Sequence, residues 1–261
     1  PLDLIDKIRQ DTPVVFEISA HQLEQVRHSP HIAILLNIFE EHLDYFGSLA
    51  RYTRAKFRIA GFQQKTDYLI TGPGVEDLIR KPGLFQPQST LISVAVAKGS
   101  SCPMSDPVIP QMKTDTGVLA GMHNQVNIAA AATACFLAGV SKPEIEDGIS
   151  SFKPLEHRLE YVGIFGGIRF YNDSISTIPE STIQAVKSID GVETLILGGY
   201  DRGISYEGLA AFLAGSSLKN LVFTGPAGRR IMELFLRFRS PAQQCFLIES
   251  FDELPGILRE N

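Results

Sequence analysis

Two kinds of hydrophobic pattern alternate along this chain. Short runs of β-branched and aliphatic residues predict strands at 14–19, 32–38, 67–70 and 91–96. Apolar residues at helical spacing predict helices at about 48–59, 74–80 and 121–137. The run at 32–38 is almost entirely apolar, as expected of a parallel strand that is covered on both faces. The first half of the chain is therefore predicted to form an α/β domain on a parallel sheet.

The second half repeats one order of elements three times. Strands are predicted at 192–197, 219–223 and 245–249, and each is followed by a helix, at 205–214, at 227–238 and from about 251. This regular succession indicates parallel strands that are joined by helical crossovers. We predict a second, Rossmann-like doubly wound domain in this half.

Residues 153–180 join the two halves. The segments 162–165 and 168–170 alternate around Gly166-Gly167 as the two strands of a hairpin would. The second of these segments runs into short polar side chains and then into a predicted helix start. The chain is thus expected to comprise two domains, residues 1–154 and residues 155–261.

Composition and charge exclude several functions. The 261 residues carry 24 Lys and Arg against 29 Asp and Glu, and no region combines dense basic side chains with aromatics, so nucleic-acid binding is not expected. The longest apolar stretch, 128–140, is short and rich in alanine, which predicts a buried helix and no membrane insertion. Three isolated cysteines, Cys102, Cys135 and Cys245, form no disulfide or zinc pattern, so we expect a cytoplasmic protein.

Ionisable side chains lie where predicted strands end. Glu17 closes the first run, and His42 belongs to a polar cluster after the second. Lys56 falls on or beside the apolar stripe of the next helix, where a lysine extends its amine to solvent, pairs with an acid or is chemically modified. Two interpretations stay open. Lys56 is an ordinary surface lysine, or the three residues hold a metal ion, with the lysine as a carbamate that supplies oxygen ligands.

Polar side chains gather at two further places. His123, Asn124 and Asn127 lie in the first turn of the alanine-rich helix, where free N–H groups favour anionic ligands. Asn124 alone is also compatible with a simple N-cap. Asp173 and Thr177 follow the hairpin, where they fit either a ligand-binding edge or an ordinary turn and helix cap.

A glycine-rich loop follows the first predicted strand of the second domain. Its sequence is GGYDRG at 198–203. Glycines allow the backbone to approach a ligand closely, and Arg202 offers a partner for a phosphate or a carboxylate. We therefore expect this loop to contribute to a ligand site.

Six segments, taken in order, resemble the Mur ligases, the ATP-dependent amide-forming enzymes of peptidoglycan precursor synthesis. They are FEISAHQLE at 16–24, LNIFEEHLDYFGSLARYTRAKFRI at 36–59, GMHNQVNIAAA at 121–131, HRLE at 157–160, NDSIST at 172–177 and GGYDRG at 198–203. Within the family, the chain is similar to the branch that joins D-glutamate to UDP-N-acetylmuramoyl-L-alanine. The resemblance implies that 1–154 is the central ATP-binding domain and that 155–261 is the C-terminal ligase domain.

The resemblance also implies which residues act. The implied magnesium-binding group, in which the lysine is carbamylated, is Glu17, His42 and Lys56. The implied ATP-binding group is His123, Asn124, Asn127, Arg158 and Asp173. The residues that fall where the family approaches its muramoyl substrate or its amino acid are Ser19, Gln22, Thr177 and Arg202. The catalytic residues are expected to be Lys56, His42 and Arg158.

The implied reaction explains these residue types. A substrate carboxylate attacks the γ-phosphate of ATP, and the amine of the amino acid then displaces phosphate from the acyl phosphate. Both steps bring anions together, so Mg²⁺ and cationic side chains must screen them. Closure of the two domains would exclude water from the acyl phosphate, which otherwise hydrolyses, and we expect the protein to act as a monomer. The family commonly has lysine at the positions of Ile175 and Arg202. Arg202 keeps the charge and Ile175 loses it, which leaves the amino-acid specificity open.

The chain also departs from the family. The phosphate loop, G-x-x-G-K-[ST], occurs nowhere in it, and the family carries that loop ahead of the position of Pro1. The family's UDP-binding domain and a last segment that contacts D-glutamate are likewise unmatched. We therefore expect a fragment, part of the central domain and most of the C-terminal domain, that is inactive in isolation.

Two other functions stay open. A folate polyglutamate ligase shares this fold and chemistry, and binding of a reduced folate instead of a UDP-muramoyl peptide would identify it. A non-catalytic nucleotide-binding module of the same fold would have lost the phosphate loop naturally, which the reading frame upstream of Pro1 would reveal.

Overall fold

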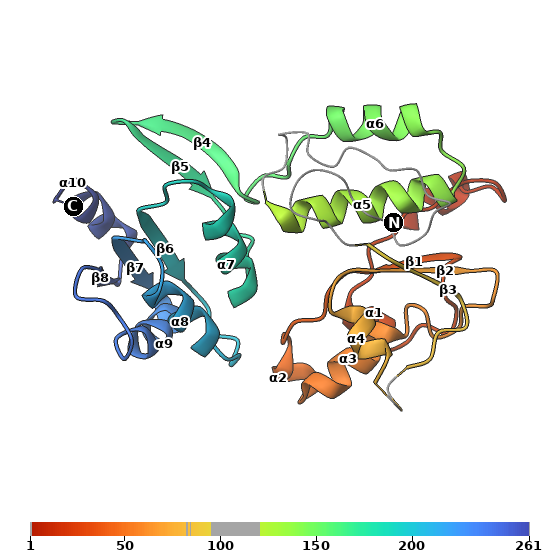
Figure 1. Cartoon of the computed structure of the whole chain (residues 1–261), viewed down its shortest axis with the longest axis horizontal. Helices are drawn as coiled ribbons and strands as arrows, with labels where there is room; N and C mark the ends of the chain where they lie inside the picture. The colour runs from red at the N-terminus through yellow and green to blue at the C-terminus, as the bar shows by residue number, and fades with distance from the viewer. Residues whose placement is uncertain (1, 82, 84, 95–120, 261) are drawn as a thin grey trace.

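The computed structural model of the chain describes residues 2–81, 83, 85–94 and 121–260. Figure 1 shows two lobes, with the described residues up to Ser151 on the right and the described residues after it on the left. Each lobe contains a parallel sheet, so the chain is a mixed α/β protein, which confirms the predicted fold class. Cys102 and the last two residues of the strand predicted at 91–96 lie outside the described residues.

The first lobe is built on a parallel sheet. Its described strands, in spatial order, are β1 (Ile32–Leu35), β2 (Tyr68–Thr71) and β3 (Thr90–Ser93). Its described helical segments are η1 (Leu2–Lys7), α1 (Ala20–Leu23), α2 (Leu43–Phe46), α3 (Leu49–Phe57), α4 (Val75–Ile79), α5 (Met122–Leu137) and α6 (Lys142–Ser151). Figure 1 shows α5 above the sheet and α1, α3 and α4 below it.

Alternate residues of this sheet pack on its two faces. Ala33, Leu35 and Leu69 belong to a cluster with residues of α3 and α4. Ile70 and Ile92 belong to a second cluster, which α5 completes. Because both faces are covered, the strands are apolar at most positions, and β1, from the run at 32–38, is apolar throughout.

The second lobe begins with a hairpin and continues into the other parallel sheet. Its described strands are β4 (Glu160–Phe165), β5 (Ile168–Asn172), β6 (Thr194–Gly198), β7 (Asn220–Thr224) and β8 (Gln244–Ile248). Its described helical segments are α7 (Pro179–Ser188), α8 (Glu207–Ala214), α9 (Gly225–Phe235), η2 (Phe251–Glu253) and α10 (Leu254–Glu260). The sheet order β6-β7-β8 and the crossover helices match the predicted strand–helix units.

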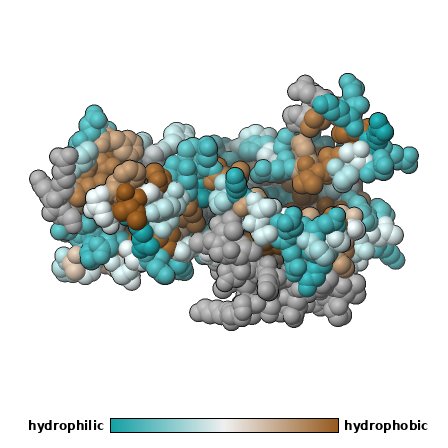
Figure 2. Space-filling model, turned by 90° about the horizontal axis from the view of Figure 1, so that it is seen from above, coloured by the Kyte–Doolittle hydropathy of each residue, from teal (hydrophilic) through white to brown (hydrophobic). Residues whose placement is uncertain are grey.

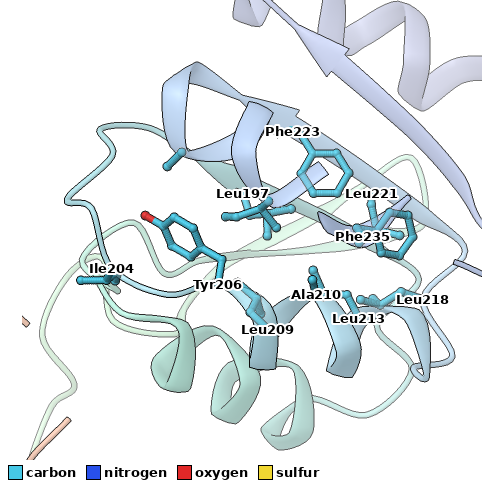
Figure 3. Packing of buried hydrophobic residues seen from close by; sticks show 12 residues of the cluster. Leu197, Ile204, Tyr206, Leu209, Ala210, Leu213, Leu218, Leu221, Phe223 and Phe235 are labelled. Atoms are coloured by element: carbon cyan, nitrogen blue, oxygen red, sulfur yellow. The ribbon is translucent and has the colours of Figure 1, made fainter. Parts of the chain in front are cut away.

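The core of the second lobe lies between this sheet and its helices. Figure 3 shows Leu197, Leu221 and Phe223 of the strands against Leu209 of α8 and Phe235 of α9. Phe223 and Phe235 are fully buried, with ring centroids 5.8 Å apart. The same cluster includes Ile204 and Tyr206, so the loop after β6 is attached to the core at its far end.

The hairpin forms as predicted. β4 and β5 pair antiparallel, and Gly166 and Gly167 turn the chain with positive φ angles of 59° and 85°. Because a side chain disfavours such angles, the two glycines fix the place of the turn. The proposed domain boundary after residue 154 falls in the connection between α6 and β4.

The hairpin leaves apolar side chains exposed. Those that keep half or more of their surface are Tyr161, Val162, Ile164, Phe165 and Ile168. Figure 2, seen from above, shows hydrophobic surface on the lobe at the left, which carries the hairpin. In the part of the chain that the structure describes, no helix is long and apolar enough to cross a bilayer.

The strand predicted at 14–19 is wrong. This run has no regular secondary structure, and Val14, Val15 and Phe16 expose 59%, 99% and 53% of their surface. Among the described strands, β1 pairs with β2 alone, so no strand lies beside this run to complete a ladder. A β-branched run becomes a strand only where a neighbouring strand and a core receive it.

Candidate active site

Charged side chains from both lobes meet at Glu41, between β1 and α2. The Thr177 hydroxyl of the second lobe donates a hydrogen bond to Glu41 Oε1 at 3.2 Å. Arg202 Nη1, also from the second lobe, lies 3.9 Å from the same oxygen, and His42 Nε2 lies 3.7 Å from it. One carboxylate therefore links the end of β1 to two loops of the second lobe.

Lys56 lies near this carboxylate. Ser48 caps α3 by accepting from the Arg51 N–H at 3.3 Å, and the helix then places Lys56 one turn after the buried Tyr52. Lys56 Nζ is 5.0 Å from the Tyr52 ring centroid. Burial lowers the pKa of Lys56, and the Glu41 charge opposes this shift. Lys56 is therefore a half-buried amine, and the simple surface lysine is the poorer description of it.

Tyr52 reports on the same environment. Burial first, and the Glu41 charge second, raise the pKa of its hydroxyl to about 12. Glu41 thus acts electrostatically on Tyr52 and Lys56 as well as touching residues of the second lobe. The carboxylate is the common neighbour of the groups at this end of the sheet.

His42 is held among aromatic rings. It precedes α2 with a left-handed backbone, φ 56°, which is uncommon outside glycine. Its ring centroid lies 4.9 Å from that of His21 and 6.2 Å from that of Tyr52. His21 in turn contacts the Tyr45 ring at 4.5 Å. These contacts restrict the imidazole and leave Nε2 on the side of Glu41.

The structure does not join Glu17 to this group. Glu17 is exposed on irregular backbone, and among the described residues no hydrogen bond or ion pair links it to His42 or Lys56. Ser19 and Gln22 form a capping box at the start of α1, in which Gln22 Oε1 accepts from the Ser19 N–H at 2.9 Å. Their substrate-binding role stays a prediction.

The predicted ATP-binding group draws on both lobes. Asn124 is buried at the start of α5, and its Oδ1 accepts from Asn127 Nδ2 at 3.4 Å. Burial lowers the pKa of the neighbouring His123. The Asp173 charge opposes that shift and the Arg158 charge adds to it, so both second-lobe residues lie within electrostatic reach of α5.

Hydrogen bonds fix Asp173 and the backbone beside Arg158. Asp173 Oδ1 accepts from the Leu159 N–H at 3.0 Å, and Oδ2 accepts from the Ser176 hydroxyl at 2.5 Å. His157 and Leu159 both have positive φ angles, 65° and 47°, on either side of Arg158. Such angles are costly for residues with side chains, so the Asp173 bond helps to hold this turn.

His123 has an unusual feature among the described residues. Its Nδ1 is buried without a hydrogen-bond partner. A buried polar atom left unpaired is costly, and a bound group that donates or accepts there would remove that cost. The position at a helix start beside two asparagines fits the polyanion that the sequence predicts here.

Charge substitutions in the second lobe are expected to move the pKa of His123. Asp173→Asn removes a charge that favours the imidazolium, so the pKa should fall further below its ordinary value. Arg158→Gln removes a charge that disfavours it, so the pKa should rise. A histidine NMR titration of the substrate-free protein measures both shifts.

Glu160→Gln serves as the matched control for that titration. Its carboxylate lies 3.6 Å from His157 Nδ1, not beside His123. The pKa of His123 should therefore stay at the wild-type value in this variant. Identical His123 titrations in all four proteins would show that the two lobes do not meet at α5.

Sequence reasoning missed the residue at the centre of this site. Glu41 belonged to a polar cluster after a predicted strand, but no role was assigned to it. The one signal in the sequence that could have pointed to Glu41 is its position directly before His42, a predicted site residue. Its contact with Thr177, 136 positions further along the chain, has no signal in local sequence.

Fold and site together define a two-lobed α/β protein whose polar groups gather where the sheets of both lobes end. A family model described as the Mur ligase middle domain matches residues 4–81. Over 247 residues the chain is 31% identical to a UDP-N-acetylmuramoylalanine–D-glutamate ligase of Symbiobacterium thermophilum, covering 90% of this chain and 54% of that protein. It is 34% identical to the ligase of that name from Acidobacterium capsulatum, covering 88% and 52%. The chain belongs to the Mur ligase family.

Solved structures agree on the fold. A MurF ligase of Thermotoga maritima in complex with ADP superposes with a TM-score of 0.65 at 18% identity, covering 93% of this chain and 58% of that one. A folylpolyglutamate synthase of Mycobacterium tuberculosis gives 0.63 at 14% identity, covering 88% and 57%. The chain spans about half the length of the curated relatives that it matches.

Proposed function

We propose that this chain carries catalytic groups of an ATP-dependent ligase that joins D-glutamate to UDP-N-acetylmuramoyl-L-alanine. One observation supports this function above the others: Thr177 and Arg202 of the second lobe meet Glu41 of the first beside His42 and Lys56. A reaction between three anionic substrates needs such a junction, where cations from both lobes surround the reacting atoms.

Each lobe has a distinct part in this proposal. His123, Asn124 and Asn127 hold the nucleotide at the start of α5, and Arg158 screens its phosphates from the second lobe. Asp173 orients the backbone next to Arg158 through the Leu159 N–H. The carboxylate of the incoming amino acid takes the hydroxyl of Thr177 and the guanidinium of Arg202, a pairing suited to a carboxylate. Ser19 and Gln22 face the muramoyl substrate.

The residues present fit magnesium on one condition. Among the described residues, no three His, Cys, Asp or Glu side chains are grouped as a metal site. Glu41 and His42 offer two donors, and a carbamate on the half-buried Lys56 would add the oxygen ligands that Mg²⁺ prefers. Glu17 would join these ligands only if its exposed segment moved toward His42 and Lys56. Magnesium, when bound, would offset the negative charge of the phosphates.

The folate alternative has weaker support. The curated relatives named D-glutamate ligases are 31% and 34% identical to this chain, whereas the folylpolyglutamate synthase structure is 14% identical. Likeness at that level shows a shared fold and not a shared substrate.

The cysteines bear on the compartment in which the protein acts. Cys135 and Cys245 are free thiols, which suits the reducing cytoplasm. We propose a monomer that acts there in cell-wall synthesis, on which cell shape and division depend.

An amide-ligation assay tests the proposed function. The protein as its gene encodes it is incubated with ATP, Mg²⁺, UDP-N-acetylmuramoyl-L-alanine and D-glutamate, and phosphate release and the new amide are measured. Release should require all four components. A reduced folate with L-glutamate serves as the competing substrate pair. Turnover of that pair at an equal rate would refute the proposal, as would nucleotide binding without any ligation.

A further inference from the structure

We propose that Arg230 is a positioning residue that sets the place of Arg202 for the amino-acid substrate. The inference rests on the proposed function, in which Arg202 binds the carboxylate of the incoming amino acid. Arg230 lies on α9 and touches neither Glu41 nor Thr177 in the described contacts. It acts on the loop that carries Arg202, residues 199–204, which we call the Arg202 loop.

The residues on either side of Arg202 are held by one carboxylate. Asp201 Oδ1 accepts from the Gly203 N–H at 2.9 Å, which closes a tight turn around Arg202. Arg230 Nη1 donates to both carboxylate oxygens of Asp201, each at 2.7 Å. The backbone before and after Arg202 is thus fixed, while its own side chain stays free to reach across to the first lobe.

A second arm of Arg230 holds the end of the same loop. Its Nη2 donates to the carbonyl oxygen of Ile204, which is fully buried. The guanidinium also lies over the Tyr206 ring, 4.7 Å from the centroid. Figure 3 shows the Tyr206 ring at the edge of the core with its hydroxyl pointing outward, and that hydroxyl approaches Asp201 Oδ1 at 3.4 Å.

Backbone contacts hold the start of the loop. The Gly199 N–H donates to the Thr224 carbonyl at 2.8 Å, and Gly199 accepts from the Ala227 N–H at 3.0 Å. A Cβ on Gly198 would lie 1.8 Å from the Thr224 oxygen, so only glycine permits this approach. The loop therefore has one anchor at each end, and Arg230 is the only side chain of α9 described in contact with Asp201.

Arginine suits this task better than lysine. The guanidinium is a planar fork whose two arms reach the Asp201 carboxylate and the Ile204 carbonyl at the same time. A lysine has a single ammonium and cannot span both acceptors in a fixed geometry. Arg230 and Asp201 line a cavity of about 370 Å³, so a shorter or uncharged side chain at position 230 crowds no neighbour.

The consequence is a specific kinetic effect. Without Arg230, Asp201 loses its cation and the Arg202 loop loses its anchor on α9, so Arg202 samples positions away from the substrate carboxylate. Binding of the amino acid weakens, while the nucleotide groups of α5 and Lys56 of α3 are untouched. A change in KM for one substrate, with kcat preserved, is the signature of lost positioning in the binding step.

The kinetic test uses Arg230→Met in the full-length protein. The KM for D-glutamate should rise by about 10-fold or more, as expected for losing charge-assisted hydrogen bonds, while kcat and the KM for ATP stay within about twofold. Arg230→Lys should recover part of the loss but not all of it. Arg229→Met is the matched control, because Arg229 is the next residue and pairs at 2.6 Å with the exposed Glu249.

Hydrogen exchange provides a readout that needs no activity. The Gly203 amide, which Asp201 protects, should exchange faster in Arg230→Met and at the wild-type rate in Arg229→Met. Faster exchange in a protein that ligates no D-glutamate would support the loop anchor and reject the proposed function. Unchanged exchange, an unchanged KM for D-glutamate, or equal losses in kcat and in both KM values would each overturn the inference.

Discussion

Replacing Lys56 with methionine is expected to abolish amide formation, lowering kcat/KM by at least about 100-fold, the usual cost of removing one charge-stabilising group from an active site. Methionine keeps the apolar stem against Tyr52 but cannot bear a charge or a carbamate. The loss should therefore fall on chemistry, with the melting temperature near that of the wild type. Steady-state kinetics with the four reaction components and thermal unfolding provide the two measurements.

Two further variants separate the possible roles of Lys56. Lys56→Arg keeps a positive charge but cannot form a carbamate, so it should be as inactive as Lys56→Met if the lysine acts as a carbamate. The intact mass of the wild-type protein with bicarbonate should then show one added CO₂, which should be absent from Lys56→Met and from Lys56→Arg. Arg54→Met, on an exposed position of the same helix, is the control and should leave kcat/KM unchanged. An active Lys56→Arg enzyme would reject the carbamate.

Replacing Glu41 with glutamine is expected to lower kcat/KM by about 10- to 100-fold, in line with the loss of a charge-assisted contact. The amide can still accept from Thr177, but it no longer attracts Arg202 across the lobes. The pKa of Lys56 should also fall further, because the Glu41 charge that raises it is gone. Steady-state kinetics measure the first effect.

The lobes themselves supply a second measurement for Glu41→Gln. If this carboxylate links the lobes, small-angle scattering of the substrate-free variant should show a larger radius of gyration than the wild type. Glu40→Gln removes a neighbouring charge that is not described in any ion pair, so it should match the wild type in scattering and in kcat/KM. Equal behaviour of the two variants would show that Glu41 makes no link.

Several elements were predictable because their causes are local. Ser48 starts α3 as its N-cap, and Gly166-Gly167 turns the β4–β5 hairpin. In each case the determining contact spans three residues or fewer, so it can be read from neighbouring positions. The parallel sheets follow in the same way, because alternating strand and helix patterns leave few topologies.

The failed strand shows where local pattern stops being enough. Residues 14–16 have strong β propensity, yet they stay exposed because no described strand pairs with them. Propensity measures how well a side chain suits a pleated and half-buried surface, and it cannot create that surface. Glu17 directly follows these residues and is exposed as they are, so its predicted place beside Lys56 stays a proposal.

The amino-acid sequence was sufficient for the α/β class, for the order of strands and helices, and for the family, since each follows from short-range periodicity and ordered motifs. It was not sufficient for Glu41 or Arg230. Glu41 acquires its importance from Thr177 and Arg202, and Arg230 from Asp201, all of them distant in the chain. A carboxylate becomes a junction, or an arginine an anchor, only when folding brings its partners within a few ångströms, because hydrogen bonds and ion pairs act at that range.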